Sequence, residues 1–421
     1  MFEVAEKASS APRATLVDPS LNRHKLKTGY FILEALNGLA AAYYFNYLFF
    51  YMRKHFDFGN QNNLLLTALH GFFYMFAAYN AGRFAQKRGY FFSLRLGFAG
   101  MGLALALGGL VPRIWGYSHT AMFAEFIVFV MWTISMCFTW PTLQALLTHN
   151  EVPTKLPRIA GIYNMIWASG AAVAYLTGGA LLEKLGGETL FWLPASLHLI
   201  QVLLLPRLQK LSLAPASSAS IADLKAEAIP PLNPRPIAKT RTFLYLAWLA
   251  NPFAYTAING ILPVIPKLSE NLGLTPTYAG FVCSIWFWTR FGAFIWFWLW
   301  PGWHYRFSWL LGAFLALIAS FIAILLSPQI WMLITAQIVF GLAVGLIYYS
   351  SLFYSMDVGE SKGKRGGIHE AAIGVGVFTG PAVGVTALHF FPGHLNAGTW
   401  AIAGILTLGL IALVGVRLKR G

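Results

Sequence analysis

The chain has 421 residues, of which 57% are hydrophobic and only 11% are charged, and its mean hydropathy is +0.60. A soluble domain typically carries about 25% charged residues, so this composition excludes an ordinary water-soluble protein. The formal net charge of +15 would suit nucleic-acid binding, but the charges lie in short clusters between apolar runs of roughly 20 residues, the length of helix that crosses a bilayer.

These apolar runs predict about twelve transmembrane helices. The runs lack the segments of about ten alternating apolar and polar residues that are typical of barrel strands. Only helices or closed barrels satisfy the hydrogen bonds of the backbone in lipid. The predicted fold class is therefore all-α and transmembrane. The spans are expected at residues 28–51, 62–83, 92–112, 120–147, 159–183, 190–206, 242–266, 276–300, 307–327, 330–356, 367–391 and 396–416.

The distribution of basic residues predicts the orientation of the chain. With a cytoplasmic N-terminus, 24 of the 30 Lys and Arg residues fall on one side, five fall on the other, and Arg290 lies inside a span. This asymmetry follows the positive-inside rule, so both termini are expected in the cytoplasm and no nucleic-acid partner is expected. We expect a multi-pass protein of a bacterial inner (plasma) membrane.

The ends and the middle of the chain are polar. Residues 1–27 lack the apolar core of a cleavable signal peptide, and Cys137 and Cys283 both fall in apolar spans, so no disulfide framework is expected. A stretch rich in Ser and Pro follows the sixth span and predicts a cytoplasmic linker with a short amphipathic piece around Ile221 to Ala228. The expected domains are a tail at 1–27, a six-helix bundle at 28–206, a linker at 207–240, a second six-helix bundle at 241–417 and a tail at 418–421.

The two halves contain a weak internal repeat. Residues 48–59 align with 262–273, with Arg53 opposite Lys267, and three glycines of the fifth span align with three of the eleventh. An even number of spans in each repeat gives both halves the same orientation. That arrangement is a parallel pseudo-two-fold, in which solute sites lie near the midplane between the halves.

The loop after the second span resembles the Gly-x-x-x-Asp-Arg-x-Gly-Arg-Arg signature of the major facilitator superfamily. Gly82, Lys87 and Gly89 match, whereas Gln86 replaces the acid. The eleventh span carries Gly380-Pro381, which resembles the glycine-proline motif of antiporters in that family, although the motif normally belongs to the fifth span. The chain is therefore identified as a member of this superfamily. The resemblance implies two six-helix bundles that act as a secondary transporter, with these motif residues as gate or conformational elements. Asp357, at the inner end of the tenth span, is expected to be a gate or loop charge.

Ionisable residues inside the spans are the first candidates for function, because each costs at least about 2.5–3.5 kcal/mol at the centre of a helix. Arg290 lies near the middle of its span and could bind an anionic solute or neutralise a coupling acid; the alternative is a structural ion pair or stacking on Trp. Glu34 could carry a coupling proton, since a carboxyl that is partly removed from water holds its proton more tightly; a helix–helix hydrogen bond is the alternative. The other candidates for proton coupling are Glu370, His369 and Glu125, the last of which also fits a position at the membrane interface.

Polar and aromatic residues of several spans predict the solute site. Individually they could serve helix packing, but as a set they predict a wide amphipathic cavity. The predicted solute-binding residues are Arg290, Asn37, Asn46, Tyr43, Asn259, Tyr255, Trp286, Tyr163 and Asn164.

Enzyme motifs are absent from the sequence. His369-Glu370 lacks the second His of a zinc HExxH site, and no Cys/His cluster has the spacing of metal ligands, so neither a metal nor another cofactor is expected. The sequence predicts a monomeric secondary active transporter that moves a small organic solute by alternating access and is coupled to protons or another ion, with membrane lipid around it. The alternatives are a lipid flippase on the same fold, an integral-membrane transferase and a receptor that does not transport.

Overall fold

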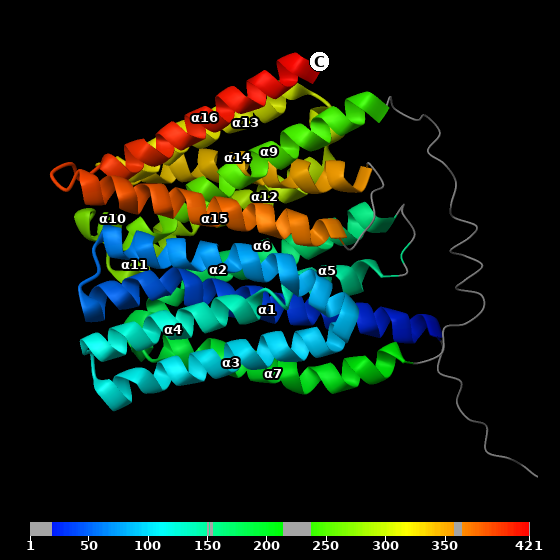
Figure 1. The fold of residues 1–421 in the computed structure, drawn as a ribbon, viewed down its shortest axis with the longest axis horizontal. Coiled ribbons are helices and arrows are strands. Elements are labelled where there is room, and N and C mark those ends of the chain that lie inside the picture. Colours follow the sequence, from blue (N-terminus) through cyan, green and yellow to red (C-terminus); the bar gives the residue numbers. More distant parts are fainter. Residues whose placement is uncertain (1–18, 150, 152–154, 214–236, 358–363, 421) are drawn as a thin grey trace, which may run out of the picture.

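The helices of the protein run side by side and form two groups (Figure 1). The computed structural model describes residues 19–149, 151, 155–213, 237–357 and 364–420. The first group comprises α1 (Pro19–Phe56), α2 (Asn60–Arg88), α3 (Tyr90–Trp115), α4 (His119–Met136), α5 (Trp140–Thr148), α6 (Leu156–Leu185) and α7 (Thr189–Ser212). The second comprises α9 (Ile237–Ile261), η2 (Leu262–Val264), α10 (Ile265–Asn271), α11 (Pro276–Cys283), α12 (Ile285–Leu299), η3 (Pro301–Trp303), α13 (Phe307–Leu325), α14 (Ile330–Asp357), α15 (Lys364–Phe390) and α16 (Ala397–Arg420).

The predicted all-α transmembrane class is confirmed. Within the described residues, ten helices are long and apolar enough to cross a membrane, counting α4 with α5 and α11 with α12 as one span each. Helices α1 and α9 run beside these ten (Figure 1) but fall outside that set. Both carry polar residues that lower their hydropathy, such as Glu34 and Asn46 on α1 and Asn251 on α9. The predicted amphipathic piece at 221–228 lies outside the described residues.

Three predicted spans are interrupted rather than continuous. The span predicted at 120–147 breaks between α4 and α5, where Pro141 stands in the first turn of α5. The span predicted at 242–266 passes from α9 through the 3-10 turn η2 into α10, and the span at 276–300 divides at Ser284 between α11 and α12. Pro lacks the N–H that a helix interior requires, which explains the breaks at Pro141 and at Pro263 in η2.

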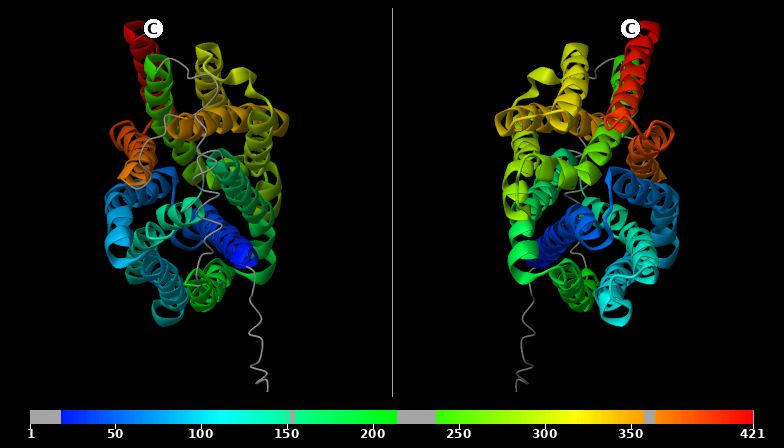
Figure 2. Two further views of the ribbon diagram at one scale, coloured as in Figure 1. Left: turned by 90° about the vertical axis from the view of Figure 1, so that its right-hand side faces the viewer. Right: turned by 90° about the vertical axis from the view of Figure 1, so that its left-hand side faces the viewer.

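The two groups, which we call the N half and the C half, pack through two seams. Helix α2 lies on α15 at one seam, and α6 lies on α11 and α12 at the other. The end-on views separate the two halves clearly (Figure 2). We call the end of the bundle at which α1 begins the inner end and the opposite one the outer end, after the predicted orientation.

Glycines allow the helices of the two halves to approach each other closely at the seams. A Cβ atom at Gly71 of α2 would overlap the backbone of Phe378 in α15, and one at Gly179 of α6 would overlap the carbonyl oxygen of Pro276. The repeat-related Gly170 and Gly376 face equivalent helices, since Gly170 lies against α1 and Gly376 against α9. The repeat that the sequence indicates therefore corresponds to matching helix packing in the two halves.

Large apolar side chains remain exposed on the outside of the bundle. Leu103, Phe123, Ile127, Trp331 and Trp400 are each more than half exposed. Apolar exposure on this scale is unusual for a soluble monomer and is what hydrocarbon chains cover in a membrane protein. The polar residues that the spans contain are mostly turned inward, and their arrangement defines the candidate site.

Candidate functional site

A cavity of about 150 Å³ lies between the two halves, and both halves supply its walls. Most of the predicted solute-binding residues line it. They are Asn46, Tyr163 and Asn164 from the N half and Tyr255, Asn259, Trp286 and Arg290 from the C half, together with Glu370. The structure thus brings together residues from α1, α6, α9, α12 and α15 that are far apart in the sequence.

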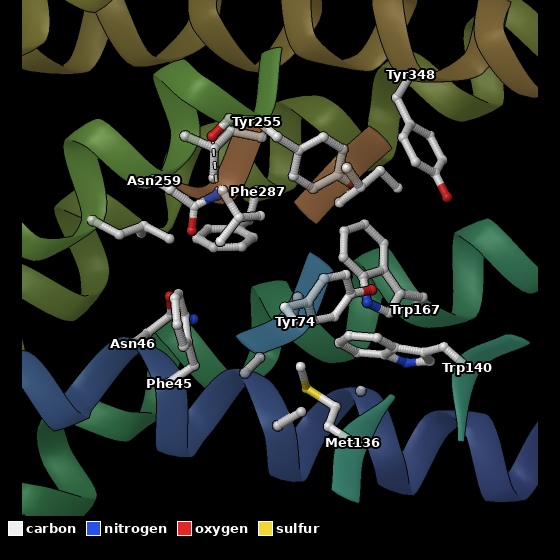
Figure 3. A pocket seen from close by; sticks show the side chains of 18 of the residues that line it. Phe45, Asn46, Tyr74, Met136, Trp140, Trp167, Tyr255, Asn259, Phe287 and Tyr348 are labelled. Atoms are coloured by element: carbon white, nitrogen blue, oxygen red, sulfur yellow. Dashed lines mark hydrogen bonds between the residues drawn. The ribbon is translucent and has the colours of Figure 1, made fainter. Parts of the chain in front are cut away.

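Helices α1 and α9 face each other across this cavity. Phe45 and Asn46 of α1 lie opposite Tyr255 and Asn259 of α9 (Figure 3). The Asn259 amide donates a hydrogen bond to the Tyr255 carbonyl of its own helix at 2.9 Å, which leaves the amide oxygen for other partners. The side-chain oxygen of Asn46 is buried without a hydrogen-bond partner among the described residues. The two repeat-related helices therefore place amide groups in an otherwise aromatic cavity.

Two predicted solute-binding residues lie behind the cavity wall instead. The Asn37 amide donates to the Thr139 hydroxyl at 3.2 Å, at the break between α4 and α5. The Tyr43 and Thr189 hydroxyls are hydrogen-bonded at 2.9 Å, within the N half. Both side chains join helices of that half, the alternative role that polar residues in spans have.

Glu370 joins the two halves at the cavity. The Tyr74 hydroxyl of α2 donates to its carboxyl at 2.7 Å, and the Gln144 amide of α5 donates at 3.4 Å. Glu370 is 4% exposed. A movement that separates α15 from α2 and α5 would break both hydrogen bonds. The side chains of His369 and Asp357, which the sequence also indicates, lie outside the described ones.

Glu34 is completely buried on α1, and neither of its carboxyl oxygens has a hydrogen-bond partner among the described residues. Tyr163 and Trp140, which line the cavity, are the polar side chains beside it, and the charge of Glu370 also acts on it. A charged carboxylate in this position would be costly. Glu34 thus lies one side chain behind the cavity wall.

Arg290 lies in the C-half wall and is 2% exposed. Its guanidinium carbon lies 4.6 Å from the ring centre of Trp167, 5.1 Å from that of Tyr348 and 5.4 Å from that of Phe294. Trp167 belongs to α6 in the N half, so the contact spans the interface. Within the described residues, Arg290 makes no ion pair. Of the two structural alternatives that the sequence allows, the structure therefore favours stacking on aromatic rings over an ion pair.

The remaining candidates lie away from the cavity. Glu125 on α4 is 1% exposed without a hydrogen-bond partner among the described residues, and its near neighbours include Tyr44 and Tyr51 of the same half. The motif residues Gln86 and Lys87 are exposed at the turn between α2 and α3. Gly89 forms that turn, and its φ of +100° falls in the left-handed region that glycine tolerates.

Several cavity residues were missed by the sequence analysis. His70 of α2 is hydrogen-bonded to the Thr133 hydroxyl at 2.8 Å, and as an ionisable residue inside a span it could have been noticed. Trp140 and Gln144 follow the break after α4, which the sequence analysis did not predict. Trp167 could not have been distinguished from the other tryptophans without the packing of α6 on α12.

Polar contacts fasten the halves at the outer end. Arg53 of α1 binds both carboxyl oxygens of Glu270 in α10, with Nη2 to Oε2 at 2.7 Å. The Asn63 amide donates to the Pro263 carbonyl at 3.1 Å. The hydrogen bonds from Arg53 lower the pKa of Glu270, and the charges of Arg53 and Lys267 act in the same direction. We call the Arg53–Glu270 pair the outer latch.

The comparisons with known proteins agree with this architecture. The family model of the Major Facilitator Superfamily matches residues 30–264. Among solved structures, the chain is similar to a bacterial homologue of the human lysosomal transporter Spinster in an inward-facing and unoccupied conformation, with a TM-score of 0.60, 15% identity and 95% of each chain covered. A search of curated proteins found no match.

These findings define a multi-pass membrane protein of a transporter fold. The chain belongs to the major facilitator superfamily.

Proposed function

We propose that the protein is a secondary active transporter that moves a small organic solute by alternating access and is driven by protons. The cavity between the halves is the observation that carries this proposal, because both halves supply its walls. Tilting of one half against the other would open such a cavity to each side in turn. The outer latch would hold the outer end closed in one of the two states.

The arrangement of the two acids supports proton coupling. Tyr163 and Trp140 lie beside Glu34, but no donor among the described residues reaches its carboxyl with hydrogen-bond geometry. Glu370 accepts hydrogen bonds from the opposite half. A proton is the simplest partner for a carboxylate buried in this way. Separation of the halves would remove the donors Tyr74 and Gln144 from Glu370 and leave its carboxyl in need of another hydrogen-bond partner. Movement of the halves and movement of protons would therefore be linked.

The lateral seams favour a solute carrier over a lipid flippase. A flippase requires an opening toward the bilayer, whereas α2 packs on α15 and α6 packs on α11 and α12. Near the inner end, a Cβ atom added at Gly161 of α6 would lie 4.0 Å from the indole ring of Trp298 in α12. The described helices therefore cover both sides of the cavity.

The test is solute-driven proton movement in liposomes. Protein reconstituted with an internal pH-sensitive dye is exposed to small acids, amines, amino acids and sugars, with protein-free liposomes as the background. We expect one solute class to move protons, and we expect Glu34→Gln to abolish this flux while solute exchange continues. Glu188→Gln changes a half-exposed acid outside the cavity and should have no effect. Proton flux that persists in Glu34→Gln would remove Glu34 from the mechanism, and the absence of flux with every class would contradict proton coupling.

A further inference from the structure

The hydrogen-bonding edge of Arg290 is open although its faces are covered. Three aromatic rings lie within 5.4 Å of the guanidinium carbon. Cation–π contacts use the face of the group, whereas its N–H donors lie along the edge. Nε and Nη2 are buried and have no hydrogen-bond partner among the described residues. Buried donors without acceptors are costly, and charged ones more so. The Tyr255 hydroxyl also lies beside the guanidinium, but Nε and Nη2 remain without a hydrogen-bond partner among the described residues, so Arg290 is incompletely satisfied.

The open pair of nitrogens is the pair that binds a carboxylate. Nε and one terminal nitrogen form the fork that matches the two oxygens of a carboxylate. The protein uses this geometry elsewhere, because Nε and Nη2 of Arg53 bind the two oxygens of Glu270. At Arg290 the same two donors are presented without a carboxylate from the part of the chain that the structure describes.

Neither acid near the cavity fills this role. The Glu370 carboxyl is engaged by Tyr74 and Gln144 of the N half. Glu34 lies beside Tyr163 and Trp140. Among the described residues, no ion pair joins Arg290 to Glu34 or Glu370, so no nitrogen of Arg290 lies within 4.0 Å of either carboxylate. Of the two roles that the sequence allows for Arg290, the geometry thus favours an anionic ligand over a coupling acid.

The cavity also limits the size and the charge of the ligand. Its volume of about 150 Å³ is close to that of a cavity that holds benzene. Among the lining residues that the structure describes, Arg290 is the single Lys or Arg, and Glu370 is also present. One guanidinium compensates one negative charge, so a doubly charged phosphate would bring an uncompensated charge into a site that already contains an acid. Phe45, Trp132 and Phe287 supply apolar surface for the remainder of the ligand.

We propose that the cavity binds a small monocarboxylate, with its carboxylate on Nε and Nη2 of Arg290 and its apolar body among the aromatic side chains. This inference rests on the proposed function only in taking the ligand to be the transported solute. The binding itself can be measured without transport.

The experiment is thermal unfolding of the purified full-length protein in detergent with added ligands. Acetate, benzoate and phenylacetate are the probes, benzamide is the neutral analogue of benzoate, and inorganic phosphate tests the second class of anion. Binding to the folded state raises the unfolding temperature. We expect at least one monocarboxylate to raise it in a saturable way, and benzamide and phosphate to give no shift.

Substitutions then locate the site. Arg290→Gln should abolish the shift, and Arg290→Lys, which keeps the charge but loses the fork, should weaken binding about tenfold or more. Arg420→Gln is the matched control, since Arg420 also stacks on a ring, that of Tyr245 at 4.4 Å, but is exposed outside the cavity. If Arg290→Gln does not fold, the comparison of benzoate with benzamide in the unsubstituted protein still decides the question.

The possible results separate the ligand from the transport mechanism. Equal shifts with benzoate and benzamide, a retained shift in Arg290→Gln, or no shift with any of the three monocarboxylates would each overturn the inference. Binding of a monocarboxylate without solute-driven proton flux in liposomes would keep the inference and contradict proton-coupled transport. Proton flux driven by a neutral solute, in protein that binds no monocarboxylate, would support proton-coupled transport and overturn the inference.

Discussion

Removal of the outer latch is expected to favour the state in which the outer end is open. Arg53 binds both oxygens of Glu270, but the two side chains are 20% and 50% exposed, so solvent weakens the pair. Exposed ion pairs contribute about 0.2–1 kcal/mol, and two parallel hydrogen bonds place this pair near the upper limit. A loss of about 1 kcal/mol changes the ratio of the two states about fivefold.

The assay is a distance measurement between spin labels on cysteines introduced at Thr120 and Gly393, exposed positions at the outer end of the N half and the C half. The native cysteines are buried and should not be labelled. Arg53→Gln should raise the ratio of long to short distances about fivefold. Lys267→Gln is the matched control, because Lys267 lies 3.6 Å from Glu270 in its own half and does not cross the interface.

The latch also predicts a direction of pH dependence. The pKa of Glu270 is lowered while Arg53 is bound. The contribution of the pair is therefore complete above the ordinary carboxyl pKa of about 4.3 and is lost as the pH falls through the lowered pKa. The difference between the unsubstituted protein and Arg53→Gln in the population of long distances isolates the latch; this difference should stay constant between about pH 5 and 8 and should disappear below about pH 4. An unchanged distribution in Arg53→Gln, or an equal shift in Lys267→Gln, would refute this reasoning.

Two further substitutions test packing and burial. Gly179→Ala places a methyl group on the carbonyl oxygen of Pro276 and should lower the free energy of unfolding by about 1–3 kcal/mol, which is measured as a lower unfolding temperature. The control is Gly292→Ala, which has open space around it and should have little effect. Equal effects of the two substitutions would contradict close packing at the seam. Glu125→Met removes a buried carboxyl without a hydrogen-bond partner among the described residues and should maintain or raise the unfolding temperature. Solute-driven proton flux should continue in this variant, and loss of flux would instead assign Glu125 to proton coupling.

The sequence by itself determined the environment and the class of the fold. Membrane insertion and helices follow from the apolar runs, because a backbone in lipid must satisfy its own hydrogen bonds. The cost of a charge inside a span identified Arg290 and Glu34 as residues that need an explanation. The polar positions of α1 and α9 also predicted much of the cavity, since seven of the nine expected solute-binding residues line it.

Tertiary structure decided which face of each helix meets which neighbour. Helical spacing places Glu34 and Asn37 on one face of α1, but only the packing of α4, α5 and α6 shows that this face lies behind the cavity wall. The breaks after α4 and α9 fall at Pro141 and Pro263, but Pro252 and Pro381 lie inside continuous helices, so proline alone did not predict which spans are interrupted. The open edge of Arg290 is likewise a property of its surroundings, because Trp167 and Tyr348 reach it only when α6 and α14 are in place. Hydropathy depends on each residue separately, whereas partners and cavities depend on side chains that are distant in the chain.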